Sequence, residues 1–141
     1  MIMTRDRTFS AALSALDTAG LRPTRQRVQL LHLLQAGGHR HLTAEQLHAE
    51  AKQAGLSVSL ATIYNALKQF TQAHLLREVV VEPGVSYFDT NMGDHHHFYF
   101  EAERRLQDIP ADSVAVSALP LAPAGTAVAR VDVVIRVVPQ P

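Results

Sequence analysis

The chain has 141 residues, of which 47% are hydrophobic and 6% aromatic, and its formal net charge of zero argues against a nucleic-acid binder that relies on bulk charge alone. It contains no cysteine, which excludes disulfide bonds and thiolate metal ligands and fits the cytoplasm, where we expect the protein to act. Neither the N-terminal residues nor the apolar run at residues 131–138 has the uncharged length of a signal peptide or a membrane span, so we expect no membrane partner.

Charge is nevertheless distributed unevenly along the chain. Residues 1–82 contain nine Lys or Arg and six Asp or Glu, a net charge of +3, whereas residues 83–141 contain four and seven, a net charge of −3. Between Thr18 and Ala44 there are four arginines and no acidic residue. Because affinity for DNA comes mainly from neutralising phosphates, this basic run favours a nucleic-acid contact in the first half of the chain.

Two helices are predicted at the start of the chain. Apolar residues recur at helical spacing from Phe9 to Leu16, and Gly20 follows as a C-cap. A second apolar stripe begins after Thr24 and stops at Gly37, which marks the end of the second helix.

Two more helices are predicted next. Thr43 and Gln46 have the spacing of a capping box, which starts a third helix that ends at Gly55. Ser59 is the predicted N-cap of a fourth helix. The apolar side of this fourth helix consists of Leu60, Ile63, Leu67 and Phe70. Its opposite, polar side consists of Thr62, Tyr64, Asn65, Lys68 and Gln69.

The apolar period then changes to that of strands. We expect a hairpin formed by residues 75–82 and 85–90 around the turn Pro83-Gly84, and a third strand at residues 95–101. Residues 109–119 are compatible with one or two helical turns, and residues 126–138 predict a final strand.

Helix–turn–helix followed by a hairpin is the order of a winged-helix DNA-binding domain. In such a domain the second helix, here the fourth of the chain, enters the major groove. Asn65 and Gln69 have the paired donor and acceptor that can read adenine, and Thr62, Tyr64 and Lys68 suit phosphates. An amphipathic helix with no partner would show the same polar face, but the basic run upstream favours DNA.

A cluster of three histidines, His95, His96 and His97, lies between Asp94 and an aromatic run. His-rich short tracts are typical of metal sites, and adjacent aromatic rings also suit a haem. On a strand, His95 and His97 share one face and His96 lies on the other, so one strand can serve two sites. The alternative interpretation is a solvated polar tip.

Four motifs together resemble the ferric uptake regulator superfamily. They read "LRPTRQRVQLL", "HRHLTAEQLHAEA", "SLATIYNALKQFTQAHLLR" and "GVSYFDTN…DHHHF". Within that superfamily the chain is most similar to the iron response regulator branch, on the motifs "SLATIYN", "YFDTN", "DHHHF", "DIP" and "VDVVIRV".

The resemblance implies a dimeric transcription factor of the α+β class. Residues 1–90 would form the winged-helix DNA-binding domain, and residues 91–141 a small α/β domain for dimerisation and effector sensing, with the final strand in the sheet that makes the homodimer. In the iron response regulator branch the protein acts on double-stranded DNA when iron is low, and haem releases it. The predicted DNA contacts are Arg22, Thr24, Arg25, Ser59, Thr62, Tyr64, Asn65 and Lys68.

The resemblance also implies metal ligands. Its interdomain regulatory site places His41, Asp89 and His96 at three ligand positions, while Phe98 stands at a fourth where relatives have histidine. The structural CxxC zinc site is absent, because residues 100–104 replace it. The candidate ligands for haem or a divalent ion are therefore His41, Asp89, His95, His96 and His97.

Three functions are compatible with these residues. The first is the iron- or haem-responsive regulator, and the second is a regulator that senses a divalent ion such as manganese, iron or zinc without haem. The third is a small metalloenzyme built on the histidines. No HExxH pattern or other catalytic signature is present, so we expect no enzyme activity.

Overall fold

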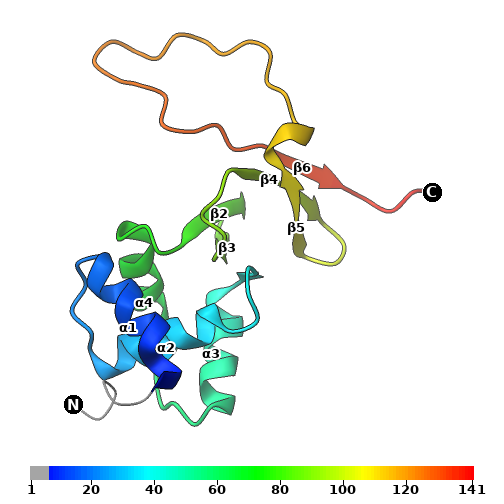
Figure 1. Cartoon of the computed structure of the whole chain (residues 1–141). Coiled ribbons are helices and arrows are strands. Elements are labelled where there is room, and N and C mark those ends of the chain that lie inside the picture. The colour runs from blue at the N-terminus through cyan, green and yellow to red at the C-terminus, as the bar shows by residue number, and fades with distance from the viewer. Residues whose placement is uncertain (1–6) are drawn as a thin grey trace. The chain divides into compact units, whose positions relative to one another are not determined.

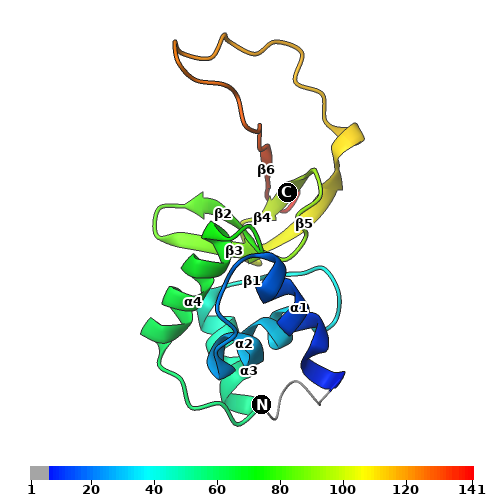
Figure 2. The same cartoon turned by 60° about the vertical axis from the view of Figure 1, so that its left-hand side comes forward.

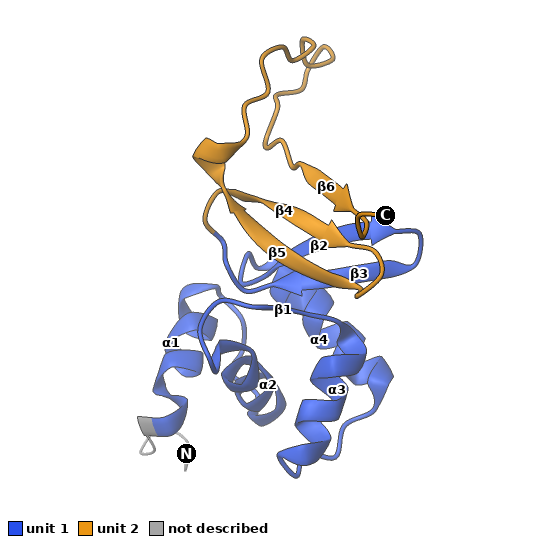
Figure 3. Cartoon of the chain, turned by 90° about the vertical axis from the view of Figure 1, so that its right-hand side faces the viewer, with its two compact units in different colours: residues 1–92 blue, residues 93–141 orange. Residues whose placement is uncertain are grey.

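The computed structural model describes residues 7–141, and the chain divides into two compact units, unit 1 at residues 1–92 and unit 2 at residues 93–141 (Figure 3). Unit 1 contains helices α1 to α4 and a small sheet, and unit 2 contains a second small sheet (Figure 1). The mixed helix-and-sheet class predicted from the sequence is confirmed.

The helices of unit 1 follow the predicted order, and α3 and α4 begin directly after the predicted N-caps Thr43 and Ser59. They are α1 (Ser10–Thr18), which follows the short 3-10 turn η2 (Arg7–Phe9), α2 (Arg25–Gln35), α3 (Ala44–Gln53) and α4 (Leu60–Gln72). The side chains of Thr24, Thr43 and Ser59 each accept a hydrogen bond from the first turn of the helix that follows, which satisfies N–H groups left free there. No helix in the described part of the chain has the length and apolar composition needed to cross a membrane.

One apolar core holds these helices together and fixes the orientation of α4. Ile63, Leu67 and Phe70 of α4 are fully buried against core residues of α1, α2 and α3. Burying one such side chain stabilises the fold by about 1.5–3 kcal/mol. This packing leaves the other side of α4 in solvent, where the exposed side chains include Tyr64, Asn65, Lys68 and Gln69.

The hairpin predicted around Gly84 is confirmed as β2 (Arg77–Glu82) and β3 (Val85–Asp89), and Gly84 adopts the positive φ of 76° that the turn requires. A short strand, β1 (His41–Leu42), pairs antiparallel with β3 and was not predicted. Two residues are too few to show an alternating apolar pattern. The sheet order is β1-β3-β2, and α3, α4 and this hairpin complete the winged helix.

Unit 2 is a three-stranded sheet with β4 (His95–Phe100) in the centre. β5 (Arg105–Pro110) pairs antiparallel with the whole of β4, and β6 (Val134–Val137) pairs parallel with the last four residues of β4. The strand predicted at residues 95–101 is thus confirmed.

Two predictions for the end of the chain are confirmed only in part. Of the one or two helical turns allowed at residues 109–119, the structure has one, the short 3-10 turn η3 (Ala111–Ser113), and the residues before it belong to β5, which continues to Pro110. The reason is that six backbone pairs with β4 outweigh a weak local preference. The final strand covers Val134–Val137 rather than residues 126–138, because only these residues lie opposite β4. Residues 114–133 form neither helix nor strand and make the long open loop of Figures 1 and 2.

Candidate functional site

A group of three potential metal ligands lies on one face of the unit 2 sheet. The alternation of β4 places His95 and His97 on the same side, with ring centroids 4.6 Å apart. The Nε2 atom of each ring lies 3.5 Å from Oδ1 of Asp108 on β5. The two imidazoles are almost fully buried, whereas the carboxylate of Asp108 is 38% exposed.

The main chain fixes the ring of His95 for ligation. Its Nδ1 atom lies 2.6 Å from the carbonyl oxygen of Gly93, so Nδ1–H donates to that carbonyl. In the neutral ring this leaves the lone pair of Nε2 facing Asp108. A hydrogen bond from the second ring nitrogen to a carbonyl is the usual arrangement of a metal-binding histidine.

Unit 1 contains a second group of potential ligands, which has only two members. His41 of β1 lies directly opposite Asp89 of β3, and its Nε2 atom is 3.3 Å from Oδ2 of Asp89. The Asp89 side chain is 1% exposed, and its Oδ1 atom accepts a hydrogen bond of 2.8 Å from the backbone N–H of Asn91. A carboxylate buried this deeply requires such partners.

Both groups fit a divalent cation in chemistry and in spacing. Imidazole nitrogens with carboxylate oxygens suit zinc, iron and manganese. Ligand atoms at tetrahedral angles about 2.0–2.1 Å from a zinc ion lie about 3.3–3.4 Å apart, close to the observed 3.3 Å and 3.5 Å. The chain can therefore offer an ion two groups of side chains with little rearrangement.

The structure separates His96 from the other two histidines. Its ring lies on the opposite face of β4, where Nδ1 accepts a hydrogen bond of 3.1 Å from the backbone N–H of Val133. His96 therefore lies apart from His95, His97 and Asp108, on the other face of β4, as the alternation of a strand predicts. Asp108 was missed in the sequence because only the pairing of β4 with β5 reveals that it lies opposite His97.

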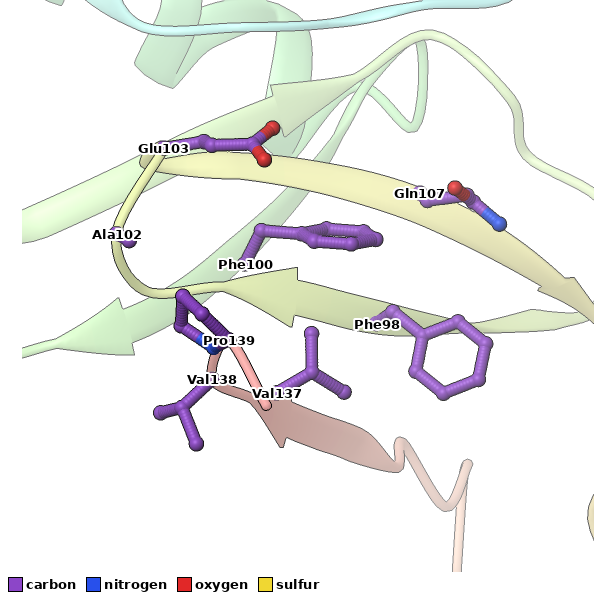
Figure 4. Close-up of a pocket in the computed structure, with 8 residues that line it drawn as sticks. All are labelled: Phe98, Phe100, Ala102, Glu103, Gln107, Val137, Val138 and Pro139. Atoms are coloured by element: carbon purple, nitrogen blue, oxygen red, sulfur yellow. The ribbon is translucent and has the colours of Figure 1, made fainter. Parts of the chain in front are cut away.

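The face of β4 that carries His96 is otherwise apolar. Phe98 and Phe100 point to this side beside Val137 of β6 and line a pocket of about 360 Å³ (Figure 4). The remaining lining residues are Ala102, Glu103, Gln107, Val138 and Pro139. One strand therefore presents potential metal ligands on one side and an open apolar surface on the other.

The predicted DNA contacts fall on a single unit. Tyr64, Asn65 and Lys68 are exposed on α4 and line one groove together. Arg22 and Arg25 are exposed just before and at the start of α2. The remaining predicted contacts, Thr24, Ser59 and Thr62, lie at the N-termini of α2 and α4, where Thr24 and Ser59 are caps and Thr62 accepts a hydrogen bond of 2.9 Å from Ser59.

A side chain that the sequence did not single out connects α2 with α4. Arg27 donates from Nη2 to Oε1 of Gln69 over 3.2 Å and from Nη1 to the carbonyl oxygen of Arg22 over 2.9 Å. Gln69, predicted to read adenine, is thus engaged within unit 1. Arg27 also keeps the segment that carries Arg22 close to α4.

A hydrogen bond of 2.7 Å joins the hydroxyl of Tyr64 on α4 to Oε1 of Glu45 in the first turn of α3. This bond is the main cause that lowers the pKa of Glu45, and it also raises the pKa of Tyr64. Because the pKa of Glu45 is lowered in the folded state, the contact is present above the usual carboxyl range and is lost as the pH falls through the lowered pKa. The Tyr64 ring itself remains 47% exposed.

These features define a class of protein: a winged-helix unit followed by a small sheet unit, with imidazole and carboxylate groups suited to a divalent ion. The model of the ferric uptake regulator family matches residues 18–129, and the chain belongs to this family. The family predicted from the motifs is confirmed.

Curated relatives and solved structures agree with this assignment. Ferric uptake regulation proteins of Neisseria meningitidis and Legionella pneumophila are 33% identical over 84 residues and 37% identical over 81 residues. These matches cover 60% and 57% of this chain, and the chain spans only 58% and 60% of the length of these relatives. The ferric uptake regulator of Pseudomonas aeruginosa, solved with manganese, superposes with a TM-score of 0.73 at 26% identity over 92% of this chain and 98% of that one. The regulator of Vibrio cholerae shares the fold, with a TM-score of 0.68 at 22% identity over 87% and 95% of the two chains.

The Tyr64–Glu45 hydrogen bond leads to a prediction about ionisation. In Tyr64→Phe the carboxylate loses its main stabilising donor, so the pKa of Glu45 should rise toward its usual value. Carboxyl-carbon NMR of Glu45 across a pH titration measures this shift. Asn65→Ala, the neighbouring change on α4, is the control and should leave the Glu45 titration as in the wild type. An unchanged titration in Tyr64→Phe would show that the bond is not formed in solution.

Proposed function

We propose that this chain is a transcription regulator whose binding to double-stranded DNA is controlled by a divalent metal ion such as Mn²⁺, Fe²⁺ or Zn²⁺. The observation that carries the proposal is the convergence of two buried histidine Nε2 atoms on one oxygen of Asp108, in a chain whose other unit is a winged helix. The similar Pseudomonas aeruginosa regulator was solved with manganese, which supports an ion of this kind.

We assign the metal ligands to two groups. His95, His97 and Asp108 form the group of unit 2, and His41 and Asp89 form the pair of unit 1. The ion would supply positive charge that draws these carboxylates and neutral imidazoles into fixed positions. The residues themselves do the rest: the main chain orients His95, and the sheet registers keep each carboxylate opposite its histidine.

The two histidines on opposite faces of β4 provide a matched test of this assignment. His97→Ala should weaken Mn²⁺ and Zn²⁺ binding at least about 10–100-fold, because it removes a direct ligand. His96→Ala, one residue away, should leave the affinity within about threefold, and titration calorimetry measures both. Binding by wild type should weaken as the pH is lowered, because protons compete for imidazole nitrogens. An equal loss of metal affinity in both variants, or no loss in either, would contradict the assignment of His97 as a ligand.

We propose that DNA contacts the exposed side of α4 and the N-termini of α2 and α4. Tyr64, Asn65 and Lys68 are exposed together on α4, in the position of a recognition helix. Helix N-termini attract phosphates through their free N–H groups. Arg22 and Arg25 add positive charge beside them, which fits the basic run of the sequence.

Two substitutions distinguish contacts that read bases from contacts that neutralise phosphates. Binding is measured on a duplex that the wild-type protein selects from a random library. Asn65→Ala should weaken binding to this duplex by about 1–3 kcal/mol and bind random DNA nearly as before. Arg22→Ala should weaken binding to all sequences alike and reduce the salt slope by about one. Fluorescence anisotropy at several salt concentrations gives both values. Arg130→Ala, in unit 2, is the control and should change neither the affinity nor the salt slope. If Asn65→Ala and Arg22→Ala both bind as well as wild type, this surface is not the DNA interface.

We further propose that unit 2 assembles the protein as a homodimer. Only three apolar side chains of its described residues are buried, those of Tyr99, Leu106 and Ile109, and a three-stranded sheet with so small a core is marginal. Phe98 and Phe100 are only half-buried on the other face, where the Arg105 guanidinium lies 3.7 Å from the centroid of the Phe100 ring, and the connection at residues 114–133 forms no helix to cover this face. A second copy would cover this face and match the two-fold symmetry of a palindromic operator.

The dimer proposal is tested by placing a charge on this face. Light scattering should find the wild type dimeric at micromolar concentration. Phe98→Glu should shift it toward monomer, because a carboxylate would be buried without a partner. Val80→Glu, at an exposed apolar residue of unit 1, is the control and should remain dimeric. A monomeric wild type, or a dimeric Phe98→Glu protein, would contradict the proposed interface.

Haem as the effector, with membership of the iron response regulator branch and release from DNA by haem, is a narrower proposal that rests on the sequence motifs. The geometry favours a divalent ion instead, since the side chains of His95 and His97 are 4% and 5% exposed and leave little room for a flat ligand. A Soret band after reconstitution of the protein with haem would support haem as the effector. A colourless protein that binds zinc would support the divalent ion. The regulator proposal also implies a cytoplasmic location and no enzymatic role.

A further inference from the structure

We propose that Arg40 is the positioning residue that transmits the state of the His41–Asp89 pair to the helices that meet DNA. This inference rests on the proposed function and concerns its regulation: an ion that takes His41 and Asp89 as ligands changes DNA affinity through Arg40. Every contact in the argument lies within unit 1.

The backbone of Arg40 is bound to the strand that carries Asp89. Arg40 immediately precedes His41, and Thr90 immediately follows Asp89. The N–H of Arg40 donates to Oγ1 of Thr90 over 2.9 Å, and the N–H of Thr90 donates to the carbonyl oxygen of Arg40 over 3.1 Å. These bonds extend the β1–β3 pairing by one position, so a change in the separation of His41 and Asp89 displaces Arg40 as well.

The side chain of Arg40 reaches two helices from this position. Its Nη1 and Nη2 atoms donate to the two carboxylate oxygens of Glu50 on α3 over 2.8 Å and 2.7 Å. Nη2 also donates to the carbonyl oxygen of Leu33 in the last turn of α2 over 2.7 Å. The planar guanidinium makes all three bonds in one orientation, which a lysine cannot reproduce.

α3 continues the connection to the recognition helix. Glu50 lies in its last turns, and Glu45 in its first turn accepts the hydrogen bond from Tyr64 of α4. A helix of this length moves as one body, so a shift imposed at Glu50 is felt at Glu45. The described contacts thus run from the His41–Asp89 pair through Arg40 and α3 to a predicted DNA-contact residue.

The partial exposure of the Arg40–Glu50 ion pair indicates that its main role is not to stabilise the fold. The Arg40 and Glu50 side chains are 27% and 35% exposed, and ion pairs in such positions contribute only about 0–1 kcal/mol to stability. The three-way geometry instead holds β1, α2 and α3 in a set arrangement. Coupling between two sites requires an element of this kind that both sites bias.

The test compares the DNA affinity of one protein in two states, loaded with Mn²⁺ or Zn²⁺ and treated with a chelator. The ratio of the two dissociation constants is the metal response, and binding uses a duplex selected by the wild type. The wild-type response should lie in the usual 5–150-fold range of coupling, and Arg40→Met should reduce it to about twofold or less. Its metal affinity, measured by calorimetry, should stay within about threefold of wild type. Arg130→Met, which breaks an arginine–carboxylate pair with Asp132 in unit 2, is the control and should keep the full response.

Glu50→Gln examines the same link from the other side and replaces Arg40→Met if that variant does not fold. It should lose the metal response to a similar extent, and the double variant should lose no more than either single one, because both act through one contact. Arg40→Lys should keep little of the metal response, because lysine cannot make the three bonds of the guanidinium.

A full response in Arg40→Met, or a loss matched by an equal loss of metal affinity, would overturn the inference. If metal leaves the DNA affinity of the wild type unchanged, the proposed function itself fails, and the inference falls with it.

Discussion

The pairing of β1 with β3 is the contact on which unit 1 depends for both its candidate ligands and its connection to the helices. It involves only two residues of β1, yet it places His41 opposite Asp89 and leads directly to Arg40. Without it, the carboxylate of Asp89 would lie buried without an imidazole beside it, which is unfavourable. For stability alone, an apolar pair in place of His41 and Asp89 would pack at least as well.

A similar constraint organises unit 2. Side chains of β4 alternate, so His95 and His97 lie on one face and Phe98 and Phe100 on the other. Six consecutive pairs with β5 define this register, and a slip by one residue would exchange the two faces. The same strand thus separates a ligand-bearing surface from an apolar one, and the two proposed activities of unit 2, metal binding and dimerisation, need not compete for side chains.

The contacts between helices in unit 1 are polar where they face solvent. Arg27 of α2 reaches Gln69 of α4, and Tyr64 of α4 reaches Glu45 of α3, while Arg40, which precedes β1, connects to Glu50 of α3. Exposed bonds of this kind add little to stability, which comes from the apolar core beneath them. Their physical effect is to restrict the orientation of α2, α3 and α4 relative to one another, and orientation is what a DNA-binding surface requires. The zero net charge of the chain is compatible with this surface, because the basic residues are concentrated in unit 1.

The sequence by itself determined the helices of unit 1, their caps, the wing and the side of α4 that faces solvent. These features follow from local rules, namely capping chemistry at Thr43 and Ser59 and an apolar period that only one face of a helix can satisfy. It also identified the family and most of the candidate ligands, because motifs preserve residue types at fixed spacing. Only the tertiary structure decided that Asp108 joins His95 and His97, since that depends on which residue of β5 lies opposite each histidine. It likewise decided the extent of β5 and β6 and the existence of β1, because a short strand is stabilised by its partner rather than by its own residues.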